Sequence, residues 1–282
     1  MHKVLTMDDM ERFRIRNLVL NDIEAQLHGA DSFQVARYKM FLAIRHHIPQ
    51  LPHAPYYPPF GSFESIPGKA MVLDNALSRA MKEIANQINS FGQMIRSLEA
   101  WDLVIEDLDY KQIFSLAIEH IEPLANLAIS ATQAIRGQMI YATVECGALI
   151  NSIIGQPLRW DGSTHVTMKV AKSVAENWKG WPELAEKLTL LEAQELNEAS
   201  GHFRNSFQHG APRQLVIGLT EHTEWTKHAD GSFSWGIGTQ DPIKLKEIIP
   251  HLKKAHHDLL RAQEAIIELT KEWESAVPIA VV

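Results

Sequence analysis

Proline is distributed very unevenly along the chain, and this distribution restricts the fold more than any other feature. Six of the thirteen prolines lie between residues 49 and 67, whereas residues 68–156 contain only Pro123. Because proline interrupts helices, the second region can form long helices and the first cannot. Apolar residues recur there at helical spacing and predict amphipathic helices at about 69–100, 103–121 and 124–154, the last two separated by Pro123. We therefore expect a mainly α-helical bundle.

Helix start and stop residues define the shorter helical segments. A helical pattern opens at Thr6 and closes at Gly29, and Asp31 is expected to cap a second helix that ends before Pro49. A short helix is expected at about 165–178.

Two further long helices are predicted in the C-terminal half. One begins at Pro182, a favourable first helical residue, and continues until Gly210 and Pro212 stop it. The other spans about 243–274 and carries an apolar stripe along one side, which packs it against the bundle.

Residues 214–237 have a different composition, because β-branched and aromatic residues gather there around the turn Asp230-Gly231. They predict a small antiparallel β-hairpin or a three-stranded insert, with strands at 215–217, 223–226 and 232–235. We therefore divide the chain into an N-terminal helical region, 1–66, and a helical bundle, 67–282, that carries the β insert at 213–239.

The loop at 49–67 contains four aromatic residues between its prolines: Tyr56, Tyr57, Phe60 and Phe63. Two interpretations are open. The aromatic side chains can pack back on the helices, since apolar loop residues usually find cover. Alternatively, the loop is a docking segment for a partner protein.

Charge and composition narrow the class of protein. A net charge of -7 repels phosphates at long range, so any nucleic-acid site must be local. The N-terminal segment reaches Asp8 and Glu11 before any apolar block forms, and charged residues interrupt every apolar run. We therefore expect no secretory signal and no membrane-spanning helix. A single cysteine, Cys146, fits a buried thiol in a reducing compartment, which predicts a cytoplasmic protein.

Several common enzyme motifs are missing. Ala70 stands where a phosphate-binding loop requires a hydroxyl, and Gly236-Ile237-Gly238 lacks the third glycine of a dinucleotide site. The doublets His46-His47 and His256-His257 diverge by about 100° on a helix, and no Glu-x-x-His pair occurs. We therefore expect no metal and no cofactor.

The hexapeptide Arg204-Asn205-Ser206-Phe207-Gln208-His209 stands at the end of the predicted 182–209 helix. It resembles the Arg-x(4–6)-His motif of the HEPN superfamily of helical-bundle domains, and Arg204, Asn205 and His209 match the form in which asparagine follows arginine. The motif covers six residues, and the resemblance in architecture extends over about 110–274 only. It implies a metal-independent endoribonuclease, in which the RNA 2′-hydroxyl attacks the adjacent phosphate to leave a 2′,3′-cyclic phosphate and a 5′-hydroxyl.

These residue types suit that reaction. His209 titrates near neutral pH, and a position in the last turn of a helix favours the imidazolium form that a general acid needs. Arg204 stays charged and can stabilise the negative charge that develops on the phosphate oxygens. Asn205 is expected to orient the reacting groups, and His202 is the auxiliary candidate.

Helical geometry places Arg204 and His209 about 140° apart around the helix axis, so one undistorted helix presents them poorly. We expect a homodimer through the 182–209 helix, as the resemblance implies. It also suggests a toxin or antiviral defence effector, with RNA as substrate and an antitoxin or other protein as partner. Two alternatives stay open. One is a non-catalytic HEPN-like module that binds a nucleotide or a protein, and the other is a scaffold in which Arg204 and His209 only satisfy helix carbonyls.

Overall fold

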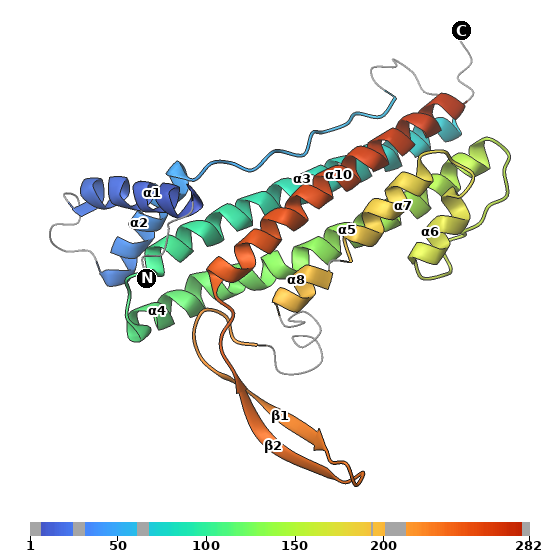
Figure 1. Ribbon diagram of the computed structural model, residues 1–282. Helices are drawn as coiled ribbons and strands as arrows, with labels where there is room; N and C mark the ends of the chain where they lie inside the picture. Colours follow the sequence, from blue (N-terminus) through green and yellow to red (C-terminus); the bar gives the residue numbers. More distant parts are fainter. Residues whose placement is uncertain (1–6, 25–31, 61–67, 193, 201–212, 278–282) are drawn as a thin grey trace. The chain divides into compact units, whose positions relative to one another are not determined.

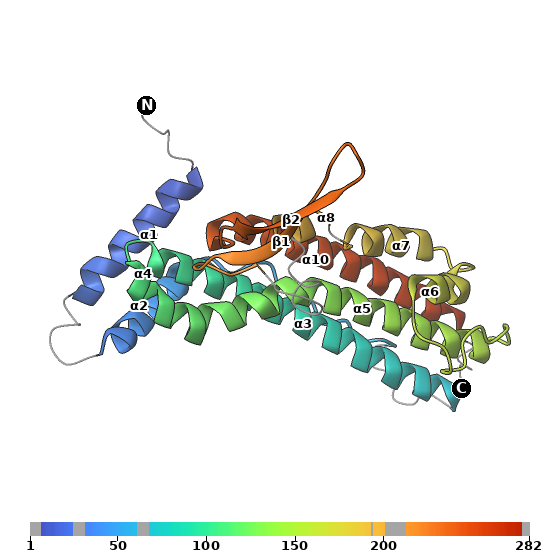
Figure 2. The ribbon, with the colours of Figure 1, turned by 90° about the horizontal axis from the view of Figure 1, so that it is seen from below.

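A computed structural model of the 282-residue chain describes residues 7–24, 32–60, 68–192, 194–200 and 213–277 (Figures 1 and 2). The described residues are mainly α-helical and carry one two-stranded antiparallel hairpin, which confirms the predicted fold class. In chain order the elements are α1 (Met7–Glu24), α2 (Phe33–His47), α3 (Lys69–Ile105), α4 (Tyr110–Leu116), the π-helix η1 (Ala117–Ile121), α5 (Glu122–Ile153), α6 (Met168–Ala175), α7 (Trp181–Leu190), α8 (Gln194–Ala199), β1 (Thr220–Lys227), β2 (Phe233–Gln240) and α10 (Leu245–Ala276). None of the described helices is long and apolar enough to cross a membrane.

The chain forms two compact units, and each is assembled from three separate stretches of sequence. Unit 1 comprises Met1–Leu51, Gln93–Ile129 and Gln194–Lys253, and unit 2 comprises Pro52–Gly92, Ser130–Ala193 and Lys254–Val282. The long helices α3, α5 and α10 each contribute residues to both units.

The core of unit 2 is built on two apolar stripes. On α3, five residues spaced three or four apart are at most 1% exposed: Leu73, Leu77, Met81, Ile84 and Ile88. On α10, the same spacing gives five residues with no exposed surface: Leu259, Ala262, Ile266, Leu269 and Trp273. This spacing places each set on one helix face. The two stripes face each other, since Oγ1 of Thr270 lies 4.0 Å from the sulfur of Met81.

The two short helices of unit 2 are held by polar side chains of the long ones. Asn151 on α5 donates to the carbonyl oxygen of Val174 at the end of α6, at 2.9 Å, and accepts from the indole nitrogen of Trp178, at 3.2 Å. Glu272 on α10 accepts from the backbone nitrogens of Lys179 and Gly180, both at 2.9 Å. A carboxylate is favourable there because the free N–H groups at the start of α7 carry partial positive charge.

A buried histidine lies in the core of unit 2. His256 is 2% exposed, its ring centroid is 6.0 Å from that of Phe91, and a Cβ added at Gly92 would meet its Nε2 at 3.0 Å. This Nε2 has no hydrogen-bond partner among the described residues. Burial lowers the pKa of His256, and the neighbouring His257 and His53 lower it further, against a hydrogen bond to the Ile88 backbone that raises it.

This histidine should make the protein less stable in mild acid. As pH falls through about 6.5, the unfolded chain protonates the residue before the folded chain does, so the free energy of unfolding falls by up to about 1.4 kcal/mol per pH unit. His256→Gln should remove this contribution, measured by urea unfolding between about pH 5.5 and 7.5. His165→Gln, at an exposed side chain that is not among the neighbours of His256, is the control. Equal slopes for wild type and His256→Gln would contradict the assignment.

Cys146 and Gly147 lie where α5 packs on other helices of unit 2. Cys146 has no exposed surface, which confirms the predicted buried thiol, and burial raises its pKa far above the ordinary value. A Cβ added at Gly147 would lie 2.7 Å from Cγ1 of Val174 on α6. The helices approach this closely because position 147 has no side chain.

Gly147→Ala should lower the free energy of unfolding by about 1–3 kcal/mol through this overlap. Val174 is buried and β-branched, so its side chain has little freedom to move away. The double variant Gly147→Ala/Val174→Ala should therefore lose less than the sum of the two single variants, measured as a double-mutant cycle in urea. Additive losses would show that the contact with Val174 is not the cause.

Unit 1 is organised around a column of aromatic rings from three elements. Phe41 on α2 stacks on Trp101 of α3 at a centroid distance of 4.4 Å, and Trp101 stacks on His120 of η1 at 5.1 Å. Arg12 on α1 forms an ion pair with Asp102, the neighbour of Trp101. These contacts join α1, α2 and η1 to α3 within unit 1.

The helix predicted at 182–209 is not continuous, which corrects the prediction. α7 ends at Leu190, and α8 begins at Gln194. Two side chains of α5 explain the break, because Arg136 donates to the carbonyl oxygen of Leu188 at 2.6 Å and Gln133 to that of Leu191 at 3.1 Å. A continuous helix would use these carbonyls for its own backbone hydrogen bonds.

Other predicted helix ends also need correction. Pro123 does not separate two helices, since the chain passes from α4 through η1 into α5, and the π-turn accommodates the missing N–H of the proline. The break comes earlier, where Asp109 caps α4 in a reciprocal pair of hydrogen bonds with Gln112. Ser32 caps α2 with its hydroxyl. The predicted cap, Asp31, lies outside the described residues.

The Pro-rich loop is tied to α10 within unit 2. The hydroxyl of Tyr57 and the backbone nitrogen of Phe60 donate to the two carboxylate oxygens of Glu274, at 2.8 and 2.7 Å. Phe60 is 3% exposed, whereas Tyr56 is 52% exposed. Two of the four aromatic residues therefore pack back on the protein. Phe63 lies outside the described residues.

Candidate functional site

The predicted catalytic residues fall in a segment that the structure does not describe. Arg204, Asn205, His209 and the auxiliary His202 all lie within residues 201–212, so their mutual geometry remains a prediction. The described residues on both sides of this segment belong to unit 1.

The flanks of the segment are well anchored. On the N-terminal side, α8 buries Leu196, and the backbone of Ser200, which is 1% exposed, donates to the carbonyl oxygen of Leu196 at 2.9 Å. On the C-terminal side, Leu215 forms a single parallel bridge with Ile243, just before α10. The predicted strand at 215–217 is thus only a bridge, and the insert is the two-stranded hairpin.

A strained turn explains why the extended conformation ends at the bridge. Val216 has φ of 66°, and the backbone nitrogen of Ile217 donates to the carbonyl oxygen of Leu215 at 2.7 Å, which closes a three-residue turn. Positive φ is costly for a β-branched residue. Such strained positions gather near functional sites.

The hairpin follows this turn. β1 and β2 pair antiparallel from Thr220↔Gln240 to Lys227↔Phe233, and Figure 1 shows the two strands side by side. The connecting loop contains the predicted turn residues, with Gly231 at φ of 84° and the carboxylate of Asp230 accepting from the backbone nitrogen of Ser232 at 2.9 Å. Glycine adopts this conformation without steric cost, which is why the sequence signal for the turn is reliable.

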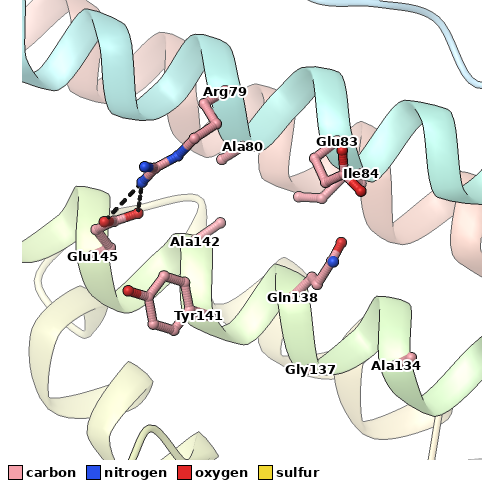
Figure 3. A pocket seen from close by; sticks show the side chains of 10 residues that line it. All are labelled: Arg79, Ala80, Glu83, Ile84, Ala134, Gly137, Gln138, Tyr141, Ala142 and Glu145. Carbon is pink, nitrogen blue, oxygen red and sulfur yellow. Dashed lines mark hydrogen bonds and ion pairs between the residues drawn. The ribbon is translucent and has the colours of Figure 1, made fainter.

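A second candidate site lies in unit 2, where a cavity of about 540 Å³ opens between α3 and α5 (Figure 3). An adjoining cavity of about 750 Å³ shares Arg79 and Glu145 with it and extends to Trp160. Small residues on the facing helix surfaces leave this space, since Ala80 and Gly137 both line the first cavity. Together we call the two cavities the α3–α5 groove.

One ion pair divides the groove. Nη2 of Arg79 donates to both carboxylate oxygens of Glu145, at 2.9 Å each. Figure 3 shows Glu83 on α3 and Gln138 on α5 pointing toward each other from the two helices. Gln87 already donates to Glu83 at 2.9 Å, whereas Oε1 of Gln138 is buried and has no hydrogen-bond partner among the described residues.

This arrangement suits binding better than catalysis. The described residues that line the first cavity include no histidine, cysteine or serine, and both of its carboxylates already accept hydrogen bonds. An apolar floor with a few polar groups is typical of a site for an amphipathic ligand. The first cavity is lined by the carboxylates of Glu83 and Glu145 and by the guanidinium of Arg79, and this excess of negative charge disfavours a phosphate-bearing ligand.

The α3–α5 groove was not predicted from the sequence. Arg79 and Glu145 are far apart along the chain, and each alone has the pattern of an exposed residue on an amphipathic helix. The one available signal was the run of small residues on both helices, which also fits close helix packing.

Comparisons with protein-family models, with curated proteins and with solved structures found no match to this chain.

Proposed function

We propose that this protein is a metal-independent endoribonuclease of the HEPN type. The observation that carries the proposal is the sequence Arg204-Asn205-Ser206-Phe207-Gln208-His209 in a mainly helical chain. Arg204 binds the scissile phosphate, His209 exchanges a proton with the attacking or leaving oxygen, and Asn205 orients the reacting groups. His202 is an auxiliary residue.

The reaction needs no redox partner and no metal. The 2′-hydroxyl loses its proton and attacks the adjacent phosphorus, and the bond to the 5′-oxygen of the next nucleotide breaks. The leaving 5′-oxygen takes up a proton, so the products are a 2′,3′-cyclic phosphate and a 5′-hydroxyl. The positive charge of Arg204 offsets the charge that develops on the non-bridging oxygens.

A homodimer completes the site in this proposal. Five positions along an undistorted helix would place Arg204 and His209 about 140° apart around the helix axis, so one chain alone would present them poorly to the same phosphate. The proposed biological role is a cytoplasmic toxin or antiviral defence effector that is held in check by an antitoxin or another protein. The net charge of -7 confines RNA binding to a local patch.

The deciding experiment is incubation of the purified protein with total RNA in excess EDTA. Cleavage should persist, and the products should carry 2′,3′-cyclic phosphate ends that resist ligation until the ring is opened and the remaining phosphate is removed. Cleavage that requires added Mg²⁺, or products with 3′-hydroxyl ends, would contradict the proposed chemistry.

A second candidate is a non-catalytic module that binds a partner protein. The exposed aromatic residues of the hairpin and the carboxylates of the α3–α5 groove favour a protein over a nucleotide as ligand. In this case no RNA is cleaved, and partner binding survives Arg204→Ala and His209→Ala.

A further inference from the structure

One face of the hairpin is apolar and uncovered. Cross-strand partners place their side chains on the same face of a sheet. The pairs Thr223↔Ile237, Trp225↔Trp235 and Lys227↔Phe233 therefore share one face. Four of these side chains, which we call the aromatic face, are 62–74% exposed: Trp225, Phe233, Trp235 and Ile237.

Among the side chains that the structure describes, the opposite face offers no comparable apolar surface, because it carries small and polar residues such as Thr226, Ser234 and Gly236. On β2 only Gly238 is buried. A two-stranded hairpin is marginally stable on its own, and a contiguous exposed apolar patch usually marks an interaction site. We therefore interpret the aromatic face as a binding surface.

We propose that the aromatic face binds the aromatic face of a second copy of this chain, with the two hairpins antiparallel about a two-fold axis. The two-fold axis runs perpendicular to the strands, between the two packed faces, and crosses the strands at the pair Glu224↔Gly236. β1 therefore lies on β1 of the second copy, and β2 lies on β2. Sheets packed face to face interdigitate their side chains in this way.

The order of residues along the strands supports this register. Lys227, near the tip of one hairpin, lies opposite Glu221, near the base of the other, and both side chains are exposed. Each large side chain also lies opposite a smaller one. Trp225 faces Thr223, Phe233 faces Thr239, and Trp235 faces Ile237 of the second copy.

A parallel arrangement fits less well. It would place Trp225 on Trp235 and Lys227 on Phe233, with large residues against large ones and no ion pair across the interface. RNA also fits less well, because the hairpin contains three acidic residues and one lysine between residues 220 and 240. Phosphates are repelled by such a surface.

The size of the aromatic face is sufficient for a specific dimer. Two tryptophans, one phenylalanine and one isoleucine exposed to this extent bury roughly 600 Å² per copy, which is near the lower end of specific interfaces. We therefore expect a dimer with a dissociation constant in the micromolar range. The inference does not depend on ribonuclease activity, since it rests on the hairpin alone.

The first test is sedimentation velocity of the full chain over a range of concentrations. Trp225→Ser/Trp235→Ser should raise the dimer dissociation constant by at least about 100-fold, since buried tryptophans dominate interface energies. The matched control is Tyr110→Ser/Phe114→Ser, which removes two exposed aromatic side chains of α4 and should leave the constant within about threefold. Circular dichroism confirms that both variants keep their helices.

Charge reversal tests the register. Lys227→Glu and Glu221→Lys should each weaken the dimer about tenfold, and the double variant should regain most of the wild-type affinity. This recovery of affinity cannot come from an ion pair within one chain, because Lys227 and Glu221 are separated by about 20 Å along the strand.

Three results would overturn the proposal. The wild-type chain could be monomeric throughout the concentration range. A dimer could persist unchanged in Trp225→Ser/Trp235→Ser, which would place the interface elsewhere, for example at α7 and α8. Finally, a monomeric chain could bind RNA through the tryptophans, shown by loss of a gel shift in the same variant. A dimer that is lost in Trp225→Ser/Trp235→Ser, in a protein that cleaves no RNA, would support this proposal and contradict the proposed function.

Discussion

Arg204→Ala and His209→Ala should each lower metal-independent RNA cleavage by about 100- to 10,000-fold. A general acid or base contributes a factor of about 10²–10⁴, and a cation aimed at the developing charge contributes a similar one. Because both residues act on one transition state, the double variant should be hardly worse than either single variant. The measurement is the initial rate of cleavage of a labelled RNA in excess EDTA.

Surface variants of the same residue types are the controls. Arg14 and His165 are exposed, so Arg14→Ala and His165→Ala should cleave at the wild-type rate. Asn205→Ala should show an intermediate loss if Asn205 orients the reacting groups. Equal residual activity in all variants would point to a contaminating nuclease and would remove the basis for the proposed function.

Trp273→Ala should lower the free energy of unfolding by about 3–5 kcal/mol, which is the usual cost of removing a large aromatic side chain from a core. Trp273 has no exposed surface, and its ring makes an edge contact with that of Trp178 at a centroid distance of 6.4 Å. It also lies 3.6 Å from the position of a Cβ at Gly147, so α5 and the segment between α6 and α7 both pack against this side chain of α10. Urea unfolding followed by circular dichroism measures the effect.

Trp273→Phe tests how much of this loss depends on the complete indole ring. The indole nitrogen of Trp273 has no hydrogen-bond partner among the described residues, so losing its N–H removes an unsatisfied polar group. The phenylalanine variant should therefore lose less than half as much as Trp273→Ala. A loss of similar size in both variants would mean that the core depends on the complete indole ring, because the phenyl ring would then replace none of its contribution.

The parts of the fold that follow from local pattern were predicted well. The stripe from Leu73 to Ile88 on α3 and the stripe on α10 are fixed by helical periodicity, and both are buried as expected. Asp230 and Gly231 marked the hairpin loop because the turn needs a positive φ and a local carboxylate contact. These features depend on residues that are neighbours in the sequence.

The features that were missed depend on residues far apart in the sequence. The break after α7 comes from Gln133 and Arg136, which bind carbonyl oxygens more than 50 residues along the chain. The α3–α5 groove depends equally on the pairing of Arg79 with Glu145. The apolar periodicity of the sequence does not predict these long-range pairings, because each of the polar side chains would also be suitable on a solvent-exposed helix face.

The candidate site divides in the same way. The chemistry of Arg204, Asn205 and His209 can be argued from residue types, because pKa and charge are intrinsic to the side chains. Their relative positions cannot, since these depend on the backbone geometry of residues 201–212 and, in the proposed homodimer, on a second copy of the chain. The aromatic face of the hairpin was partly visible in the sequence, but its exposure was not.

The burial of Cys146 makes this chain convenient for site-specific labelling. A thiol with no exposed surface and a raised pKa reacts slowly with maleimides or methanethiosulfonates, so the native sequence already behaves as a cysteine-free background. A cysteine introduced at the exposed position Thr226, on the hairpin face opposite the aromatic face, would then be the main site of modification. Spin labels attached there would report the separation of two hairpins by electron resonance, without any change to the rest of the protein.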